Sequence, residues 1–461
     1  MATVNSKSVR TGGNASLYLS KYLFLLGLSL VTFEEVRPGG IMLSDYCFLL
    51  SLVFLPKSRL LSSTRSGVLL AGSLILSGAV LSLHGPSSWA DAAGTLLKLF
   101  LLFGLIAPLA LSHSKDIYKN LLFLAGGIFV NCLIVLIQAW VFPGIVDLLS
   151  INPPQADVAF SGRYQGLTEF PVTLGLSAAL GALIGIGLFS TEKSRLVRWG
   201  LIVLVLVCTV AALLSGSRTF LASLVPGLIV FALLQKKRRL SVLYATGILV
   251  VSWGALTYLA PGMVSQYSER IDSVGLVDYR RLGSSAQAVL EISEKPIRGW
   301  GVDHFDEGGV VFLPDTGEIT GAHNTFLRYW YAAGLLGASG FLTLFVSPAR
   351  RILAVLKERM AEREANAARL ALAACVFFFI VSNLGPYLYS RYLYVPMFVF
   401  AGFAANCVGL IAARKASSPN YCAPTVNEHA GCVLETSDPS EPEYERTCEK
   451  MPRMRMHSAH L

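Results

Sequence analysis

Arginines and one histidine in this chain stand at the ends of apolar runs or at the start of an amphipathic segment. They are Arg163 in "SGRYQGLTEFP", Arg218 in "LLSGSRTFL", Arg280 and Arg281 in "DYRRLGSS", and His323, followed by Asn324, in "GAHNTFLRYWYAAGLLG". Guanidinium groups stay charged at every relevant pH and bind phosphate oxygens through paired hydrogen bonds. An imidazole, with an ordinary pKa of about 6.5, accepts a proton at neutral pH. These side-chain types together suit the binding of a polyanion beside a proton acceptor.

Each of these residues also has a structural interpretation. A single arginine at the end of a membrane helix usually extends toward lipid phosphates, and paired arginines can form a solvated helix face. A histidine at a membrane boundary is more often an interfacial hydrogen-bonding residue than a catalyst. Several arginines in loops that otherwise hold few lysines or arginines nevertheless favour one shared anionic ligand. A pyrophosphate fits, because guanidinium groups can stabilise the charge that develops as it leaves. We therefore expect group transfer from a lipid pyrophosphate to an alcohol, with the histidine taking the proton of the hydroxyl.

The elements that position these residues are membrane helices. Of the 461 residues, 54% are hydrophobic and 15% are charged, and the mean hydropathy is +0.58. A helix of about 20 residues crosses a hydrocarbon core of about 30 Å, and apolar runs of this length recur along the chain. We predict an all-α, polytopic membrane protein with about twelve spans. The predicted spans are residues 17–33, 41–55, 67–84, 93–111, 120–142, 168–190, 197–214, 218–235, 241–260, 325–346, 369–385 and 392–412.

The basic residues give the orientation of these spans. Lysines and arginines concentrate in cytoplasmic loops of membrane proteins. Here they follow spans two, four, six, eight and ten, as in "QKKRRL" and "ARRILAVLKERMAEREANAARL", whereas the alternate loops carry isolated arginines at most. This alternation predicts that both termini are cytoplasmic. It places Arg163, Arg218, Arg391 and His323 on the outer side of the membrane.

The predicted domain organisation is one transmembrane domain over residues 1–412 and a polar tail over residues 413–461. Residues 261–322 form a large outer loop, which is longer than a simple connection between two helices needs to be. Within this loop, Leu282, Ala286, Val289 and Leu290 recur at helical spacing before Pro296, which predicts an amphipathic helix against the outer membrane face and then a glycine-rich turn, "RGWG". The tail has little apolar periodicity, which predicts disorder in the cytoplasm.

The other polar residues lead to fewer predictions. Asp45 and Lys98 lie within predicted spans, where an unpaired charge is costly, so we expect each to reach water or to pair with the other. The eight cysteines lack metal-binding or redox spacing, and we predict neither a metal nor a cofactor. The net charge of +9 lies largely on the predicted cytoplasmic loops. That distribution favours contact with anionic membrane lipids and gives no argument for nucleic-acid binding.

Three motifs resemble the bacterial O-antigen ligase family, which is related to the O-antigen polymerases. His323 and Asn324, nine residues, and then "GLLG" from Gly334 to Gly337 match the pattern His-[Asn/Ser/Gln]-x9-Gly-x-x-[Gly/Thr/Tyr]. The "SGSR" turn and the segment "RRLGSSAQAVLEISEKPIRGWG" are also similar to this superfamily. The resemblance runs from about Arg163 to Gly337.

The resemblance implies a metal-independent inner-membrane glycosyltransferase of the GT-C type, acting at the periplasmic face. Its donor would be a glycan on undecaprenyl pyrophosphate, and a ligase would use lipid A-core as the acceptor. Arg218 and Arg163 would hold the pyrophosphate, Arg280 or Arg281 would contribute from the loop, and His323 would activate the acceptor hydroxyl or orient the leaving group. Asn324 would assist substrate binding.

Two alternatives remain. A polymerase uses the same donor with a growing glycan as acceptor, and we favour the ligase because of the full histidine motif and the number of spans. A transporter or lipid-linked sugar flippase is less favoured, since the link between spans six and seven is only "STEKSRLVR" and the two halves of the chain show no internal repeat.

Overall fold

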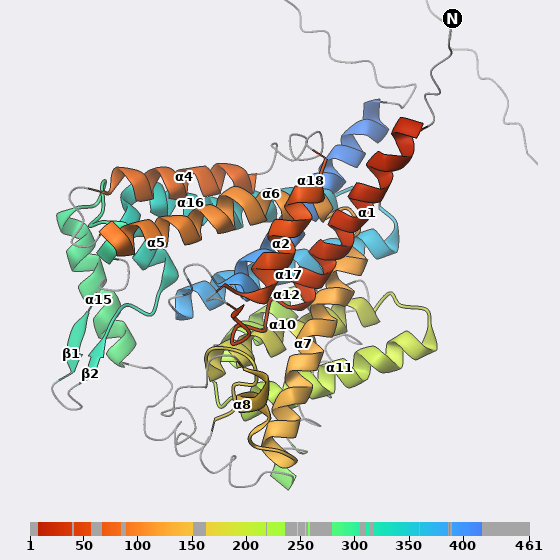
Figure 1. The fold of residues 1–461 in the computed structure, drawn as a ribbon, viewed down its shortest axis with the longest axis horizontal. Helices are drawn as coiled ribbons and strands as arrows, with labels where there is room; N and C mark the ends of the chain where they lie inside the picture. The colour runs from red at the N-terminus through yellow and green to blue at the C-terminus, as the bar shows by residue number, and fades with distance from the viewer. Residues whose placement is uncertain are drawn as a thin grey trace, which may run out of the picture. The chain divides into compact units, whose positions relative to one another are not determined.

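The computed structural model describes most of the chain. The described residues are 8–38, 41–56, 67–83, 89–150, 163–217, 219–235, 247, 254, 257–258, 279–304, 310–313, 318–358, 360–385, 387 and 390–416. Residues 1–414 form one unit by their internal contacts, and the fold is described within it. The described part is almost entirely helical (Figure 1).

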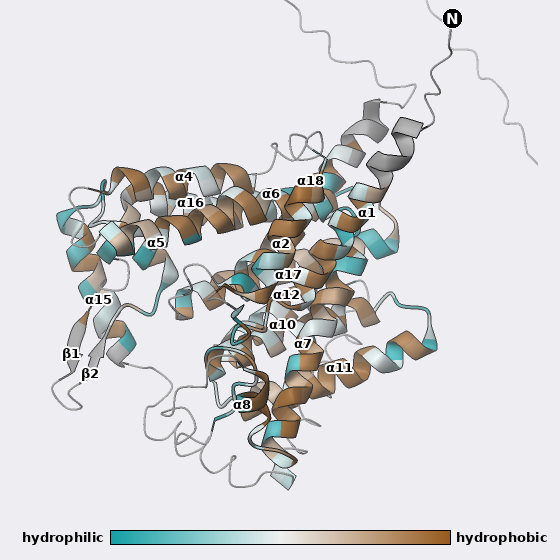
Figure 2. Cartoon of the chain, viewed as in Figure 1, coloured by the Kyte–Doolittle hydropathy of each residue, from teal (hydrophilic) through white to brown (hydrophobic). Residues whose placement is uncertain are grey.

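The helices follow the order of the predicted spans. They are α1 (Ser8–Ser29), α2 (Leu43–Phe54), α4 (Gly67–Leu81), α5 (Trp89–Leu99), a π-helical segment (Phe100–Ile106), α6 (Ala107–His113), α7 (Ile117–Trp140), α8 (Ile145–Leu149), α10 (Pro171–Phe189), α11 (Arg195–Leu214), α12 (Thr219–Leu234), α15 (Tyr279–Glu294), α16 (Thr325–Leu356), α17 (Glu362–Leu384) and α18 (Arg391–Ala416). Figure 2 shows apolar residues along these helices and hydrophilic residues at their ends and in the connections.

Eleven of the twelve predicted spans coincide with apolar helices. Among the described residues, seven helical stretches are long and apolar enough to cross a membrane, and four shorter apolar helices match predicted spans 17–33, 41–55, 67–84 and 218–235. The fourth span, 93–111, is one continuous stretch from α5 through the π-helical segment to α6. The ninth span, 241–260, lies almost wholly outside the described residues. The chain is therefore a membrane protein built of helices, and the number twelve stays a prediction.

Helix α10 is enclosed by its neighbours along most of its length. Pro171 starts it, in the first turn, where its missing N–H costs no hydrogen bond. Its glycines allow close packing, because a Cβ at Gly181 would lie 2.7 Å from Ile128 and one at Gly185 would lie 2.6 Å from Val205. Helices α7 and α11 therefore approach α10 over small residues.

Helix α16 packs along α4, as Figure 1 shows. A Cβ at Gly78 would lie 2.6 Å from the carbonyl oxygen of Ala333, and one at Gly340 would lie 2.8 Å from that of Ala71. The two helix backbones are thus in direct contact, as small residues permit in membrane helix pairs.

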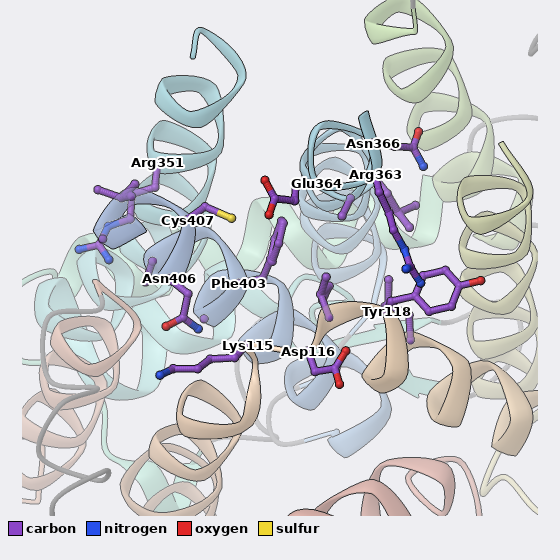
Figure 3. Close-up of a pocket in the computed structure, with 18 of the residues that line it drawn as sticks. Lys115, Asp116, Tyr118, Arg351, Arg363, Glu364, Asn366, Phe403, Asn406 and Cys407 are labelled. Carbon is purple, nitrogen blue, oxygen red and sulfur yellow. The ribbon is translucent and has the colours of Figure 1, made fainter. Parts of the chain in front are cut away.

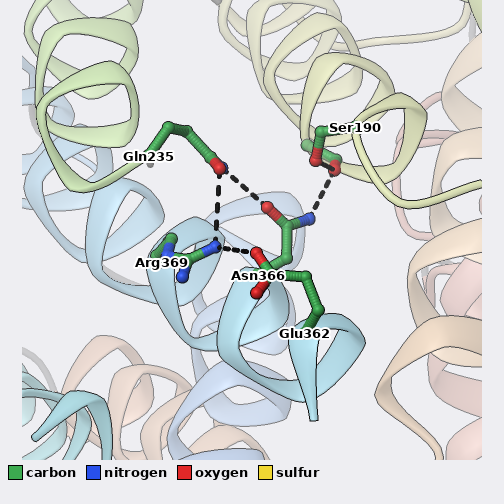
Figure 4. A network of polar contacts seen from close by, with 6 residues as sticks. Ser190, Gln235, Glu362, Asn366 and Arg369 are labelled. Atoms are coloured by element: carbon green, nitrogen blue, oxygen red, sulfur yellow. Dashed lines mark hydrogen bonds and ion pairs between the residues drawn. The ribbon is translucent and has the colours of Figure 1, made fainter. Parts of the chain in front are cut away.

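A partly buried polar network joins the ends of α10, α12 and α17 (Figure 4). The Asn366 amide accepts from Gln235 Nε2 at 2.7 Å and donates to the Gly187 carbonyl at 2.7 Å. Arg369 Nη1 donates to Glu362 Oε1 at 2.8 Å and to Gln235 Oε1 at 3.4 Å. Because the polar groups of the network hydrogen-bond to one another, they hold three helix ends together at a low cost of desolvation.

The large loop contains a feature that the all-α prediction missed. Strands β1 (Val311–Leu313) and β2 (Glu318–Thr320) form an antiparallel pair in which Phe312 is opposite Ile319. Three-residue strands are too short to give a recognisable alternation in sequence. The predicted amphipathic helix corresponds to α15, which ends two residues before Pro296.

Candidate active site

His323 stands directly before the residue that caps α16. Asn324 has an extended backbone, and its side-chain Oδ1 accepts a hydrogen bond from Leu327 N at 3.1 Å. Asparagine is a favoured N-cap because it satisfies one of the free N–H groups at a helix start. The His-Asn pair therefore combines a titratable residue with the cap that fixes its position.

The imidazole of His323 is half-buried and oriented by its own loop. Its Nδ1 lies 2.8 Å from the carbonyl oxygen of Gly321. A carbonyl only accepts, so in the neutral ring Nδ1 carries the proton and Nε2 carries the lone pair. In this tautomer Nε2 is the nitrogen that can accept a proton.

Arg328 holds the backbone next to His323. Its Nε donates to the carbonyl oxygen of Ala322 at 2.7 Å, and the residue is 7% exposed. Sequence reasoning did not single out Arg328. The sequence contains a feature that could have pointed to it, because a charged residue inside the apolar run "HNTFLRYWY" needs a partner.

Arg281 and the start of α16 are attached to the same short stretch of backbone. Arg281 Nη1 donates to the Leu384 carbonyl at 3.2 Å, and Thr325 Oγ1 donates to the next carbonyl, that of Gly385, at 2.6 Å. Thr325 Oγ1 in turn accepts from Tyr387 N at 2.9 Å. The end of α17 thus brings Arg281 and the His323 region together. Arg280 also lies in α15.

The "RGWG" turn is bonded to α16 where that helix is kinked. Gly334 has a φ of 63°, so α16 consists of two helical segments that meet at this residue. Trp300 N donates to the Tyr331 carbonyl at 2.7 Å and Gly301 N to the Ala332 carbonyl at 3.1 Å. Leu335 N donates back to the Ile297 carbonyl at 3.1 Å. The loop therefore satisfies backbone groups that the kink removes from the helix ladder.

The indole of Trp300 connects this turn to α15. Its Nε1 donates to the Glu291 carbonyl at 3.0 Å, and its ring stacks on Tyr331 with centroids 6.0 Å apart. The Lys295 ammonium lies 3.7 Å from the centroid of the indole. One tryptophan thus joins α15, the turn and α16, and it fixes the helix that carries Arg281.

The two faces of α15 have different surroundings. Ser284, Ala288 and Ile292 are buried against the protein. Leu282 and Val289 are more than half exposed. An apolar stripe without protein cover is what a helix lying on the membrane surface presents, and the predicted membrane contact of α15 stays a prediction.

Arg163 lies against the "SGSR" turn. Its Nε donates to the Ser215 carbonyl at 2.9 Å, and its side chain passes Gly216, which has a φ of 61°. Arg218 itself lies outside the described residues. The structure therefore brings Arg163 to the turn that precedes Arg218.

An acidic cluster lies against the segment that follows Arg163. Glu34 is 3% exposed, and its carboxylate accepts from Glu169 N at 3.3 Å. Arg37 pairs with the Glu169 carboxylate at 2.7 Å. Burial, followed by the neighbouring Glu169 carboxylate, raises the pKa of Glu34 to about 8. Sequence reasoning missed this cluster, although "FEEVRPGG" places two carboxylates directly after an apolar run.

Tyr387 is near enough to Glu34 and Arg281 for both to influence its pKa. Burial raises the pKa of the Tyr387 phenol well above its usual range, the nearby Arg281 lowers it and Glu34 raises it. The phenol is therefore within the electrostatic range of both charges. Glu34, Tyr387 and Arg281 belong to one neighbourhood beside the start of α16.

The expectation that Asp45 reaches water or pairs with Lys98 was wrong. Arg391, at the start of α18, donates from Nε to Asp45 Oδ1 at 2.9 Å and from Nη2 to Oδ2 at 3.1 Å. Both side chains are buried. The pair satisfies the Asp45 carboxylate without Lys98, because a guanidinium can bind both oxygens in one plane and an ammonium cannot.

The described residues contain no group of three or more histidine, cysteine or acidic side chains that could hold a metal ion.

A model of the O-antigen ligase family matches residues 201–342. No curated protein matches the chain. The matched segment includes α15, the "RGWG" turn, His323 and the kink at Gly334.

Proposed function

Because residues 201–342 carry the domain of the O-antigen ligase family, we propose that the chain is a glycosyltransferase of the periplasmic face of the bacterial inner membrane. It moves a glycan from undecaprenyl pyrophosphate to a hydroxyl acceptor. The preferred acceptor is lipid A-core, which makes the reaction O-antigen ligation in lipopolysaccharide assembly. The alternative is a polymerase that uses the same donor and a growing glycan as acceptor.

The attachment of Arg281 and Thr325 to consecutive carbonyls at the end of α17 is the observation that carries this proposal. It places a guanidinium from the loop close to the segment that presents His323. An anion-binding group and a proton acceptor in one neighbourhood suit displacement of a pyrophosphate by an alcohol. The acidic Glu34 nearby is compatible with this site because its raised pKa keeps it largely protonated at neutral pH.

The proposed step has a simple balance. The acceptor hydroxyl oxygen attacks the anomeric carbon of the donor, a new carbon–oxygen bond forms, and the bond from that carbon to the pyrophosphate breaks. His323 Nε2 takes the hydroxyl proton. The pyrophosphate leaves with the bonding electron pair, and Arg163, Arg218 and Arg281, or Arg280, stabilise its negative charge. Asn324 holds the start of α16 so that the imidazole keeps its orientation.

The ligase is preferred to the polymerase because of the full match to His-Asn-x9-Gly-x-x-Gly. The kink and the "RGWG" turn support this motif structurally, and they serve either acceptor equally well.

The test is a deletion strain whose lipopolysaccharide is separated by size. Loss of all O-antigen from lipid A-core, restored by the wild-type gene, supports the ligase. Retention of a single repeat unit on lipid A-core supports the polymerase instead. An unchanged pattern contradicts both assignments.

A further inference from the structure

Gln165 lies two residues beyond Arg163, in the segment that leads into α10. Two steps along the backbone separate Cα atoms by at most about 7.6 Å. Between these residues, Tyr164 N donates to the Leu214 carbonyl at 3.4 Å, so the segment runs against the end of α11. The sugar of the proposed donor is bonded directly to the pyrophosphate that Arg163 would hold. Gln165 therefore stands where a side chain could reach that sugar.

The Gln165 side chain is buried and lacks hydrogen-bond partners. The residue is 2% exposed. Among the described residues, it is the one buried side chain in which two polar atoms, Nε2 and Oε1, have no partner. Buried amides are normally hydrogen-bonded, because loss of contact with water is costly unless other polar groups replace it. A leucine of similar size would fill the same space without this cost. The glutamine is thus unfavourable for folding, which indicates another use for its amide.

A second buried amide in the same region shows the usual situation. Asn131 Nδ2 donates to the Thr32 carbonyl at 3.1 Å, and its Oδ1 accepts from Leu167 N at 2.9 Å. The backbone carbonyl of Gln165 is also in use, since it accepts from Thr168 Oγ1 at 2.6 Å. The segment is therefore held by these bonds, and its position does not depend on the Gln165 side chain.

The "SGSR" turn contains the same contrast between two serines. Ser215 Oγ donates to the Ala212 carbonyl at 2.6 Å and accepts from Ser217 N at 3.3 Å, so it stabilises the turn. Ser217 Oγ is buried, and no group in the described part of the chain is its hydrogen-bond partner. Ser217 directly precedes Arg218 in the sequence. A hydroxyl without a partner thus stands beside the second arginine, as the amide stands beside the first.

The polar side chains around a cavity at the other end of α16 are paired. This cavity has a volume of about 880 Å³, and Figure 3 shows Arg363 beside Tyr118 in its wall. The Arg363 guanidinium lies 3.9 Å from the centroid of the Tyr118 ring, and the Tyr118 hydroxyl donates to Glu192. Asn406 Nδ2 donates to Ser114 Oγ at 3.0 Å. These side chains have partners within the protein, in contrast to the amide and the hydroxyl beside the arginines.

We propose that Gln165 and Ser217 bind the sugar that carries the pyrophosphate of the lipid-linked donor. This inference rests on the proposed function and adds recognition of the transferred glycan to it. An amide and a hydroxyl both donate and accept, which matches the hydroxyl and acetamido groups of sugars, whereas the guanidinium groups only donate and suit the phosphates. Because the amide is covered, contact requires rotation of the flexible glutamine side chain while its backbone keeps its bonds.

The test measures the binding of two lipids to the purified full-length chain by native mass spectrometry. The probes are undecaprenyl pyrophosphate and undecaprenyl pyrophosphate that carries one N-acetylglucosamine. The test variants are Gln165→Leu and Ser217→Ala. Asn131→Leu and Ser215→Ala are the matched controls, because each removes a side chain of similar type whose polar atoms are bonded within the protein. The melting temperature of every variant is measured alongside binding.

We expect the wild type to bind the glycosylated lipid at least fivefold more tightly than the bare lipid pyrophosphate. Gln165→Leu should lose about tenfold in affinity for the glycosylated lipid and Ser217→Ala about threefold, because a neutral hydrogen bond contributes about two- to tenfold. Both variants should lose less than twofold for the bare lipid and should melt no lower than the wild type. The controls should melt lower and keep the preference for the glycosylated lipid.

Equal losses for both lipids in the test variants would overturn the inference, since the residues would then support the arginine segments and not bind sugar. A melting temperature of Gln165→Leu as low as that of Asn131→Leu would also overturn it, because the amide would then be satisfied within the folded protein. Equal binding of both lipids by the wild type would overturn this inference alone. Failure of the wild type to bind either lipid would overturn the proposed function as well.

Discussion

Gly299 and Gly334 meet backbone to backbone at the kink of α16. A Cβ on Gly299 would lie 2.6 Å from Gly334 N, and one on Gly334 would collide with the Ile297 carbonyl. Both residues have positive φ angles, 77° and 63°. The "RGWG" turn and the second part of the histidine motif are therefore one structural unit. Gly299 and Gly334 are needed for two reasons: the close contact leaves no room for a Cβ, and both residues have a positive φ.

The first prediction concerns this contact. Gly334→Ala should lower the free energy of unfolding by about 2 kcal/mol or more, because an alanine at positive φ costs about 1–2 kcal/mol and its methyl group also displaces the turn. Thermal unfolding in detergent measures the loss. Gly126→Ala, in α7 with open space around the added Cβ, is the control and should be neutral or slightly stabilising. Equal stability of the two variants would contradict the close approach.

The second prediction concerns the buried pair of Asp45 and Arg391. Asp45→Leu leaves the guanidinium buried without its carboxylate and should destabilise the protein by about 3–5 kcal/mol. The double variant Asp45→Leu/Arg391→Met removes both charges and should recover much of this loss. A double-mutant cycle of unfolding free energies provides the measurement, and additive effects would argue against direct coupling.

The third prediction is a pH dependence that Glu34 causes. Its pKa is about 8 in the folded protein against a usual 4.5, so the folded state keeps a proton that the unfolded chain has released. Stability should therefore fall as the pH rises from about 4.5 to about 8 and then level off. Glu34→Gln removes this contribution, so its melting temperature should exceed that of the wild type at pH 8 and approach it at pH 5.

Unfolding at pH 5, 6.5 and 8 tests this difference. Asp147→Asn removes an exposed carboxylate and is the control, which should follow the wild type at each pH. A Glu34→Gln curve parallel to that of the wild type would show that the carboxylate is ionised in the folded protein.

Apolar length predicted the helices well, because that signal is local in the sequence. The partner of Asp45 could not be predicted in this way, since Arg391 is 346 positions away in the chain. The role of "GLLG" was hidden for a related reason. In the sequence, Gly334 resembles any glycine that packs one helix against another. Only its contact with the "RGWG" turn shows that it forms a kink. For the candidate site, His323 and the arginines were predicted from residue type, whereas the placement of Arg328, Glu34 and Tyr387 depends on contacts between distant segments.

The fourth prediction separates two roles for Asn324. If it acts as the N-cap of α16, Asn324→Asp should keep both stability and glycan transfer, because aspartate caps equally well. Asn324→Ala should lower the unfolding free energy by about 1 kcal/mol. Transfer assays with purified protein and a lipid-linked donor provide the second measurement. Loss of transfer in Asn324→Asp at normal stability would instead indicate that the amide N–H groups bind substrate.

The fifth prediction tests the proposed chemistry. His323→Ala and Arg218→Ala should each reduce glycan transfer by at least a hundredfold, because they remove the proposed proton acceptor and a proposed pyrophosphate ligand. Both variants should still insert in the membrane, and His323→Ala should unfold close to the wild-type temperature, because the imidazole is half-buried at a helix start. His304→Gln is the control for histidine loss in the same loop, where His304 pairs with Asp303 at 3.3 Å, and it should retain most of the activity. If His323→Ala transfers glycan at the wild-type rate, the histidine is not the proton acceptor. The buried carboxyl of Glu34, in the same neighbourhood, then becomes the group to replace.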